Sequence, residues 1–307
     1  MQRFLQYLFD GLSQGSVYAL LALGLVIIYR GTGLLNFAHG EMALFCTYLT
    51  WQLHTWGIPV VIAVLLGMVA GFAIGALTEV ALVRTVAKRS EFAVFIVTIA
   101  LFLGFNWLCG AIWGGDPLPK GATGKSVSFP VIFPSGRSDF IRIAGATWRY
   151  KYLGVLLVVL VLAALLWVLF NRTRVGLAMR AVASNAESSK LVGIKTSNVL
   201  MFSWGLAVAI GALGGFMVAG LSDSVSQGMM LTVFLYAAAA ATLGGLDSPG
   251  GAVLSGLFLG VVESMTAGYQ PTWIGSEMKQ TVALLIIVAV LLFRPSGLFG
   301  TAKVERV

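Results

Sequence analysis

Long apolar runs separated by polar stretches of different lengths extend over the whole chain. A transmembrane helix needs roughly 20 apolar residues to cross about 30 Å of hydrocarbon. By that measure, apolar segments lie at 12–29, 35–53, 60–83, 92–113, 152–170, 199–221, 229–246, 251–268 and 278–293. The pattern predicts an all-α fold, a polytopic bundle of about eight or nine transmembrane helices. A polar cluster at the start of the second segment allows one of them to be broken or re-entrant.

The amino-acid composition supports this prediction. The chain is 58% hydrophobic and only 10% charged, whereas an average soluble domain is about 45–50% apolar and about 25% charged. So little charge cannot cover a surface that faces water, and lipid must therefore solvate much of the chain. We expect a single transmembrane domain that occupies residues 1–307.

The net charge of +8 does not indicate nucleic-acid binding, because the basic residues lie between apolar segments. There they are expected to contact lipid head groups and to set the orientation. More of them fall on the side of 84–90, 171–198 and the C-terminal tail, which we therefore predict to be cytoplasmic. The N-terminus would then face outward.

Cys46 and Cys109 are far apart without metal-ligand spacing, and no metal site is predicted.

The polar segment 114–151 is predicted to form a loop on the outer side. Alternating apolar positions at 127–133 and a turn signal at 134–136 precede two short segments, 140–143 and 146–150. We interpret this pattern as a small β-hairpin that rests on the membrane surface. Its basic residues outnumber the acidic Asp116 and Asp139, so that it could dock an acidic partner or contact head groups. The basic residues are Lys120, Lys125, Arg137, Arg142, Arg149 and Lys151.

A polar cluster interrupts the second apolar segment. Asn36, His39 and Gly40 follow helical i, i+3, i+4 spacing, which would place both polar side chains on one helix face. Together with Glu41, these groups are costly near a bilayer and normally face a cavity or a partner. The cluster is therefore a candidate gate in a transport pathway. The alternative is a turn near the cytoplasm in which Glu41 is a solvated cap.

Two further carboxylates lie within apolar segments. Glu263 lies deep in its segment and could line a polar path or pair with a neighbouring helix. Glu79 is close to Arg84 in the sequence, and an interfacial ion pair is the simpler interpretation.

The cytoplasmic segment 171–198 is predicted to contain two short helices. Ser184 as N-cap and Glu187 as its partner match a capping box, and Gly193 is suited to the position after the last helical residue. One helix would cover 185–192 and another 176–183. Such capped helices form a rigid projection that can bind a soluble partner. The alternative is an interfacial helix that lies on lipid.

Glycine-rich stretches favour close packing of helices. Gly211 and Gly215 form a G-x-x-x-G pattern, and 237–245 consists mostly of alanine and glycine. Small residues let helix backbones approach each other in lipid.

Four motifs together make the chain recognisable. The stretch 33–42 (GLLNFAHGEM) resembles the signature of the LivH family of ABC permeases. Segments 176–185 with 191–194, 243–246 with 250–253, and 294–300 are also similar to that family. The resemblance covers essentially the whole chain, in order and at matching length.

The resemblance implies a multi-pass permease of the bacterial inner membrane. It would form half of a pathway together with a LivM-like second permease, bind two ATPase subunits on the cytoplasmic side, and receive substrate from a periplasmic binding protein. The cargo would be branched-chain or other hydrophobic amino acids, although related members carry urea, short amides or aromatic acids. The cytoplasmic motif maps to the ATPase-coupling residues Gly176, Arg180, Ala181, Asn185 and Gly193. The first motif maps to Asn36, His39 and Glu41.

No Walker A sequence occurs in the chain, so energy from ATP would have to come from partner subunits. We expect no cofactor and no catalytic residues. An intramembrane enzyme would need a nucleophile–base pair or paired aspartates at membrane depth, whereas the aspartates of this chain lie at segment ends or in loops. The remaining alternative is a channel or secondary transporter that does not depend on ATP.

Overall fold

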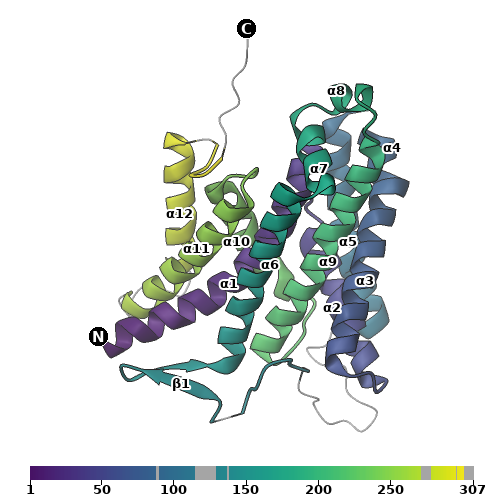
Figure 1. The fold of residues 1–307 in the computed structure, drawn as a ribbon. Helices are drawn as coiled ribbons and strands as arrows, with labels where there is room; N and C mark the ends of the chain where they lie inside the picture. Colours follow the sequence, from purple (N-terminus) through teal and green to yellow (C-terminus); the bar gives the residue numbers. More distant parts are fainter. Residues whose placement is uncertain (88–89, 115–128, 137, 271–277, 295, 301–307) are drawn as a thin grey trace. The chain divides into compact units, whose positions relative to one another are not determined.

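The computed structural model describes residues 1–87, 90–114, 129–136, 138–270, 278–294 and 296–300 (Figure 1). Its elements belong to two compact units, which we describe separately. The first unit contains residues 1–26, 133–167 and 235–307, and the second contains 27–132 and 168–234.

The structure is almost entirely helical, with one small two-stranded sheet. The elements in chain order are α1 (Gln2–Thr32), α2 (His39–Thr55), α3 (Val60–Thr78), the π-helical turn η1 (Glu79–Val83), α4 (Arg84–Ala87), α5 (Glu91–Trp113), β1 (Phe140–Ile143), β2 (Ala146–Arg149), α6 (Tyr150–Arg172), α7 (Arg174–Ser184), α8 (Ala186–Leu191), α9 (Thr196–Ser222), α10 (Met229–Gly244), α11 (Pro249–Tyr269) and α12 (Met278–Phe293). Each predicted apolar segment corresponds to a helix.

Within the described ranges, 6 helices are long and apolar enough to cross a membrane. These are Gln2–Thr32, Val60–Ala87, Phe92–Trp113, Tyr150–Arg172, Thr196–Ser222 and Pro249–Tyr269. The helix Met229–Gly244 and the apolar part of α12 are shorter, and α2 has 17 residues. The chain is therefore a multi-pass membrane protein, but the predicted count of eight or nine spans is not confirmed.

The second predicted segment is not helical from its beginning. Gly33 adopts a positive φ of 71°, and α2 begins only at His39. The predicted helical spacing of Asn36, His39 and Gly40 is therefore wrong, because Asn36 precedes the helix. The polar side chain of Asn36 bonds locally to the backbone, which favours a turn over a helix at this position.

In the second unit, α2 and α3 both pack against α9 through glycines. A Cβ atom at Gly211 of α9 would lie 3.0 Å from Cε1 of His39, and one at Gly215 would collide with Thr47. On α3, a Cβ atom at Gly71 would lie 3.0 Å from the carbonyl oxygen of Val208. The predicted packing role of the Gly211/Gly215 pattern is confirmed, and α9 is buried along most of its length.

In the first unit, α1 and α11 approach each other through glycines on both helices. A Cβ atom at Gly11 would lie 2.6 Å from Cα of Val261, and one at Gly256 would lie 2.7 Å from the backbone nitrogen of Ala19. The glycines belong to two G-x-x-x-G patterns, Gly11 with Gly15 and Gly256 with Gly260. The contact between these patterns was not predicted, although both are visible in the sequence.

The predicted hairpin exists, but only its second part forms strands. β1 and β2 pair antiparallel, with Ile143 opposite Ala146, and positive φ angles at Ala144 and Gly145 form the two-residue turn. Residues 129–136 form no strand, and 127–128 lie outside the described residues. The hairpin is attached to α1, since Trp148 stacks on Phe9.

The predicted basic surface of this loop is only partly described. Arg142 and Arg149 are exposed, whereas Lys151 is buried and does not belong to such a surface. Asp116, Lys120, Lys125 and Arg137 lie outside the described residues.

Candidate functional site

Asn36 forms the turn that leads into α2. Its side-chain oxygen accepts a hydrogen bond of 3.0 Å from the backbone N–H of Ala38, and its amide nitrogen lies 3.7 Å from the sulfur of Met42. The residue is fully buried. These contacts make Asn36 the group that holds the polar turn in shape.

His39 is the first residue of α2 and packs against α9 at Gly211. Its side chain is fully buried. Within the part of the chain that the structure describes, neither ring nitrogen has a hydrogen-bond partner. A buried polar group in this condition is costly and calls for an explanation.

Glu41 is also buried but contacts a different helix. Its carboxylate accepts a hydrogen bond of 3.0 Å from the side-chain amide of Asn106 in α5. Asn106 in turn accepts a hydrogen bond of 2.9 Å from the side chain of Gln227 and donates to the Gln227 carbonyl. No ion pair of Glu41 occurs in the described ranges. The carboxylate is therefore held by a neutral amide network and not by a cation.

His39 and Glu41 consequently do not form one cluster. They are two residues apart on α2, so one contacts α9 and the other α5. Sequence reasoning missed Asn106 and Gln227, although an amide within the apolar run 92–113 was a visible signal.

Glu263 lies in the first unit, whereas the other three predicted pathway residues lie in the second. Its carboxylate accepts a hydrogen bond of 2.5 Å from the hydroxyl of Tyr18, whose ring stacks on that of Tyr236 with centroids 4.7 Å apart. The predicted pairing with a neighbouring helix is confirmed, since Tyr18 belongs to α1.

The helix α7 of segment 171–198 begins at a capped tight turn. The Thr173 hydroxyl accepts a hydrogen bond of 3.0 Å from the backbone N–H of Gly176. A Cβ atom at Gly176 would collide with the backbone of Leu169 and Phe170. Glycine is therefore required for the close return of α7 onto the end of α6. Along α7, Met179 and Val182 are buried, Ala181 is half-buried and Arg180 is exposed.

The predicted capping box at α8 is wrong in its residues. Ser184 is the last residue of α7, so its helical backbone cannot cap the next helix. Asn185 has the extended backbone of an N-cap, and its side chain accepts a hydrogen bond of 2.8 Å from Ser188. At the other end, the prediction for Gly193 is confirmed: φ is 84°, and Gly193 and Ile194 donate to the carbonyls of Lys190 and Ser189.

Two large apolar side chains are exposed where α8 ends. Leu191 is 88% exposed and Val192 is 76% exposed. The segment 171–198 that contains them is mostly basic, with Arg172, Arg174, Arg180, Lys190 and Lys195 against the single acidic Glu187. Exposed apolar side chains in a basic segment are suited to contact with another protein.

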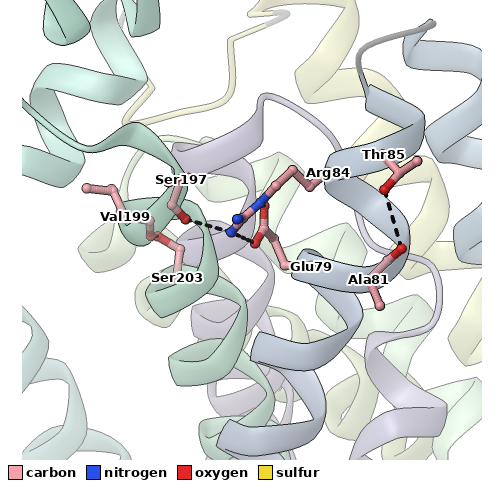
Figure 2. A network of polar contacts seen from close by, with 7 residues as sticks. All are labelled: Glu79, Ala81, Arg84, Thr85, Ser197, Val199 and Ser203. Carbon is pink, nitrogen blue, oxygen red and sulfur yellow. Dashed lines mark hydrogen bonds and ion pairs between the residues drawn. The ribbon is translucent and has the colours of Figure 1, made fainter.

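The predicted ion pair of Glu79 is also confirmed. Figure 2 shows the carboxylate facing the guanidinium of Arg84, with Nη2 and Oε2 2.5 Å apart. The same nitrogen donates a hydrogen bond of 3.1 Å to the carbonyl oxygen of Ser197 in α9. The contact with Ser197 could not be anticipated from the sequence.

The chain matches a family model over residues 7–291; the family is described as "Branched-chain amino acid transport system / permease component". The chain is 28% identical to BraD, a high-affinity branched-chain amino acid transport system permease protein of Pseudomonas aeruginosa, over 99% of this chain and 98% of that one. It is 30% identical to LivH of Salmonella typhimurium, a permease protein with the same description, over 99% and 98%. The galactose/methyl galactoside import permease protein MglC of Escherichia coli is 26% identical over 86% of this chain and 78% of that one. No solved structure matches the chain significantly.

Proposed function

The chain belongs to the family of branched-chain amino acid transport system permease components, and from that premise we propose that it carries branched-chain or related hydrophobic amino acids into the cell. It is a membrane-spanning permease subunit of an ABC importer, and ATP hydrolysis takes place on partner subunits. In this proposal a second, LivM-like permease completes the pathway, two ATPase subunits bind from the cytoplasm, and a periplasmic binding protein delivers the substrate. The full-length similarity to BraD and LivH is the observation that carries the proposal.

We assign the gate of the pathway to the start of α2. Asn36 shapes the turn, and the buried His39 and Glu41 offer polar groups that the described residues satisfy only in part. Intramembrane polar groups of this kind normally face a pathway or a partner. We also assign Glu263 of the first unit to the pathway, where the hydrogen bond from Tyr18 orients its carboxylate.

We assign coupling to α7 and α8. Gly176 permits the close return of α7, Asn185 and Gly193 cap the two ends of α8, and Arg180 is exposed for contact. A rigid pair of capped helices can transmit a force that a flexible linker would absorb. ATP binding would draw the ATPase subunits together and tilt the helices that are attached to this segment.

The experiment that tests this function uses the complete importer. The tagged permease is purified from cells that also express the second permease and the ATPase, and it is reconstituted in liposomes with its binding protein. We expect co-purification with the ATPase and uptake of leucine, isoleucine or valine only with ATP. The Arg180→Glu variant should assemble but lose most ATP-driven uptake. Purification without the ATPase together with uptake that needs no ATP would contradict the proposal.

Cargo class is tested in the same liposomes. Competition by urea, short amides, aromatic acids and sugars is compared with competition by branched-chain amino acids. Stronger competition by one of the other classes would reject amino acids as the cargo without affecting the assignment as an importer subunit.

A further inference from the structure

The π-helical turn η1 brings two oppositely charged residues to the same side of a helix. In an α-helix, residues five positions apart are separated by about 140° around the axis and do not face each other. The wider π turn at Glu79–Val83 instead closes after five residues. Glu79 and Arg84 therefore pair across this turn, and π turns occur frequently at functional sites.

The ion pair has well-defined geometry. Arg84 Nε donates a hydrogen bond of 3.1 Å to Glu79 Oε1, and Nη2 donates to Oε2 at 2.5 Å. The Glu79 side chain is only 1% exposed, whereas that of Arg84 is 32% exposed. A two-pronged bond of this kind orients the guanidinium and leaves Nη2 available for another acceptor.

That acceptor belongs to another helix. Nη2 of Arg84 lies 3.1 Å from the carbonyl oxygen of Ser197, in the first turn of α9 (Figure 2). The neighbouring Thr85 provides a contrast, because its hydroxyl bonds to the carbonyl of Ala81 in the same helical stretch. The polar contact of Arg84 joins two helices, whereas that of Thr85 joins none.

The position of Ser197 gives this contact its importance. The helix α8 ends at Leu191 and α9 begins at Thr196. Arg84 therefore binds α9 immediately after the segment to which we assign ATPase coupling. Gly75 of α3 precedes Glu79 in the same helical stretch, and a Cβ atom there would lie 2.9 Å from the carbonyl carbon of Trp204 in α9. The helices are thus joined both by close glycine packing and by the polar contact at their ends.

We propose that Glu79 and Arg84 form a clamp that makes α3 move together with α9 when the ATPase subunits displace α7 and α8. This inference rests on the proposed function. Glu79 positions the guanidinium, and Arg84 holds the first turn of α9. Both are positioning residues, and neither contacts the substrate in this proposal. Without the clamp, displacement at α7 and α8 would tilt α9 but would reach α3 only through apolar packing.

The test measures ATP hydrolysis and amino-acid uptake in the reconstituted importer. Arg84→Ala and Arg84→Lys remove the fork of donors, and Glu79→Gln removes the charge that orients it. We expect each variant to hydrolyse ATP but to transport less substrate per ATP, by about tenfold for Arg84→Ala. Arg84→Lys should lie between Arg84→Ala and the unmodified protein, because an ammonium keeps the charge without the bidentate geometry.

The matched control is Thr85→Val, which removes a hydroxyl next to the clamp but no contact between helices. Its transport per ATP should equal that of the unmodified protein. A clamp with a purely structural role would lower the yield or thermal stability of the Arg84 variants and leave transport per ATP unchanged in the assembled fraction. That result would overturn the proposal. If Arg84→Ala does not assemble, Arg84→Lys and Glu79→Gln decide the question in the same way.

The outcome separates this inference from the proposed function. Absence of ATP-driven uptake in the unmodified importer would contradict the function itself. Normal ATP-driven uptake together with unchanged transport per ATP in all clamp variants would contradict the clamp alone.

Discussion

At the scale of single residues, glycines determine how closely the helices of each unit approach. Gly75 of α3 faces the backbone of Trp204, whereas Gly104 of α5 is exposed and has no atom near the position of a Cβ. In lipid, helices associate through van der Waals packing of this kind, because burial of apolar side chains gives little advantage there. Glycine is therefore required for close helix packing at position 75 but not at position 104.

Substitution of Gly75 tests this difference. Gly75→Ala should destabilise the folded protein by about 1–3 kcal/mol, because the added methyl group forces the two helix backbones apart. Gly104→Ala should be neutral or stabilising by roughly 0.5–1 kcal/mol, since alanine favours the helix and meets no neighbour. Thermal or denaturant unfolding in detergent measures both. Equal effects of the two substitutions would contradict the packing of α3 against α9.

At the scale of elements, the end of α7 and the start of α8 decide the shape of the segment to which we assign coupling. Ser184 and Asn185 are adjacent polar residues, and both are suited by type to cap a helix. The structure assigns the cap to Asn185, since Ser184 is still part of α7. Sequence reasoning placed the cap one residue too early, because helix boundaries depend on where the previous helix stops.

A pair of alanine substitutions distinguishes the two caps. Asn185→Ala should weaken α8 by about 1 kcal/mol through loss of the bond to Ser188. Ser184→Ala should have little effect, because alanine continues α7. Hydrogen exchange of the amides in α8 of the assembled importer reports this directly. Faster exchange in Ser184→Ala than in Asn185→Ala would show that Ser184 is the cap after all.

At the scale of the whole molecule, the buried polar residues of α2 connect the fold with transport in our proposal. His39 contacts α9 and Glu41 contacts α5, so that a movement of either helix would change the surroundings of one of these groups. Neither group contributes a strong bond to the fold of the described part: His39 has no hydrogen-bond partner there, and Glu41 accepts a hydrogen bond from one neutral amide. In our proposal these groups serve transport and not stability, since polar groups at membrane depth are costly and normally face a pathway or a partner.

Substitutions at α2 should therefore impair transport more than assembly. We expect His39→Ala and Glu41→Gln to reduce the rate or apparent affinity of uptake by about tenfold, which corresponds to roughly 1.4 kcal/mol. Thr98→Val is the matched control, since among the described residues the buried hydroxyl of Thr98 bonds only to the carbonyl of Phe95 in its own helix. Uptake kinetics in liposomes and co-purification measure the two properties. Unchanged kinetics in both α2 variants would reduce the cluster to a structural turn.

The sequence alone determined the helical class and the approximate position of each helix, and it provided candidate residues for coupling and gating. These properties depend on the length of apolar runs and on capping signals, and both involve residues that are close together in the sequence. The family resemblance was recognisable from the same local motifs. Gly193 and the Glu79–Arg84 pair were predictable because their partners are close in sequence.

Only the tertiary structure decided which groups that are far apart in the sequence meet. It directed His39 and Glu41 to different helices, joined Glu41 to Asn106 and Gln227, and brought Arg84 to the carbonyl of Ser197. These partners are far apart in sequence, and their contacts depend on how helices rotate and cross when small residues allow them to pack. Local patterns carry no information on that rotation, so the apolar runs predicted the helices but not the polar contacts between them.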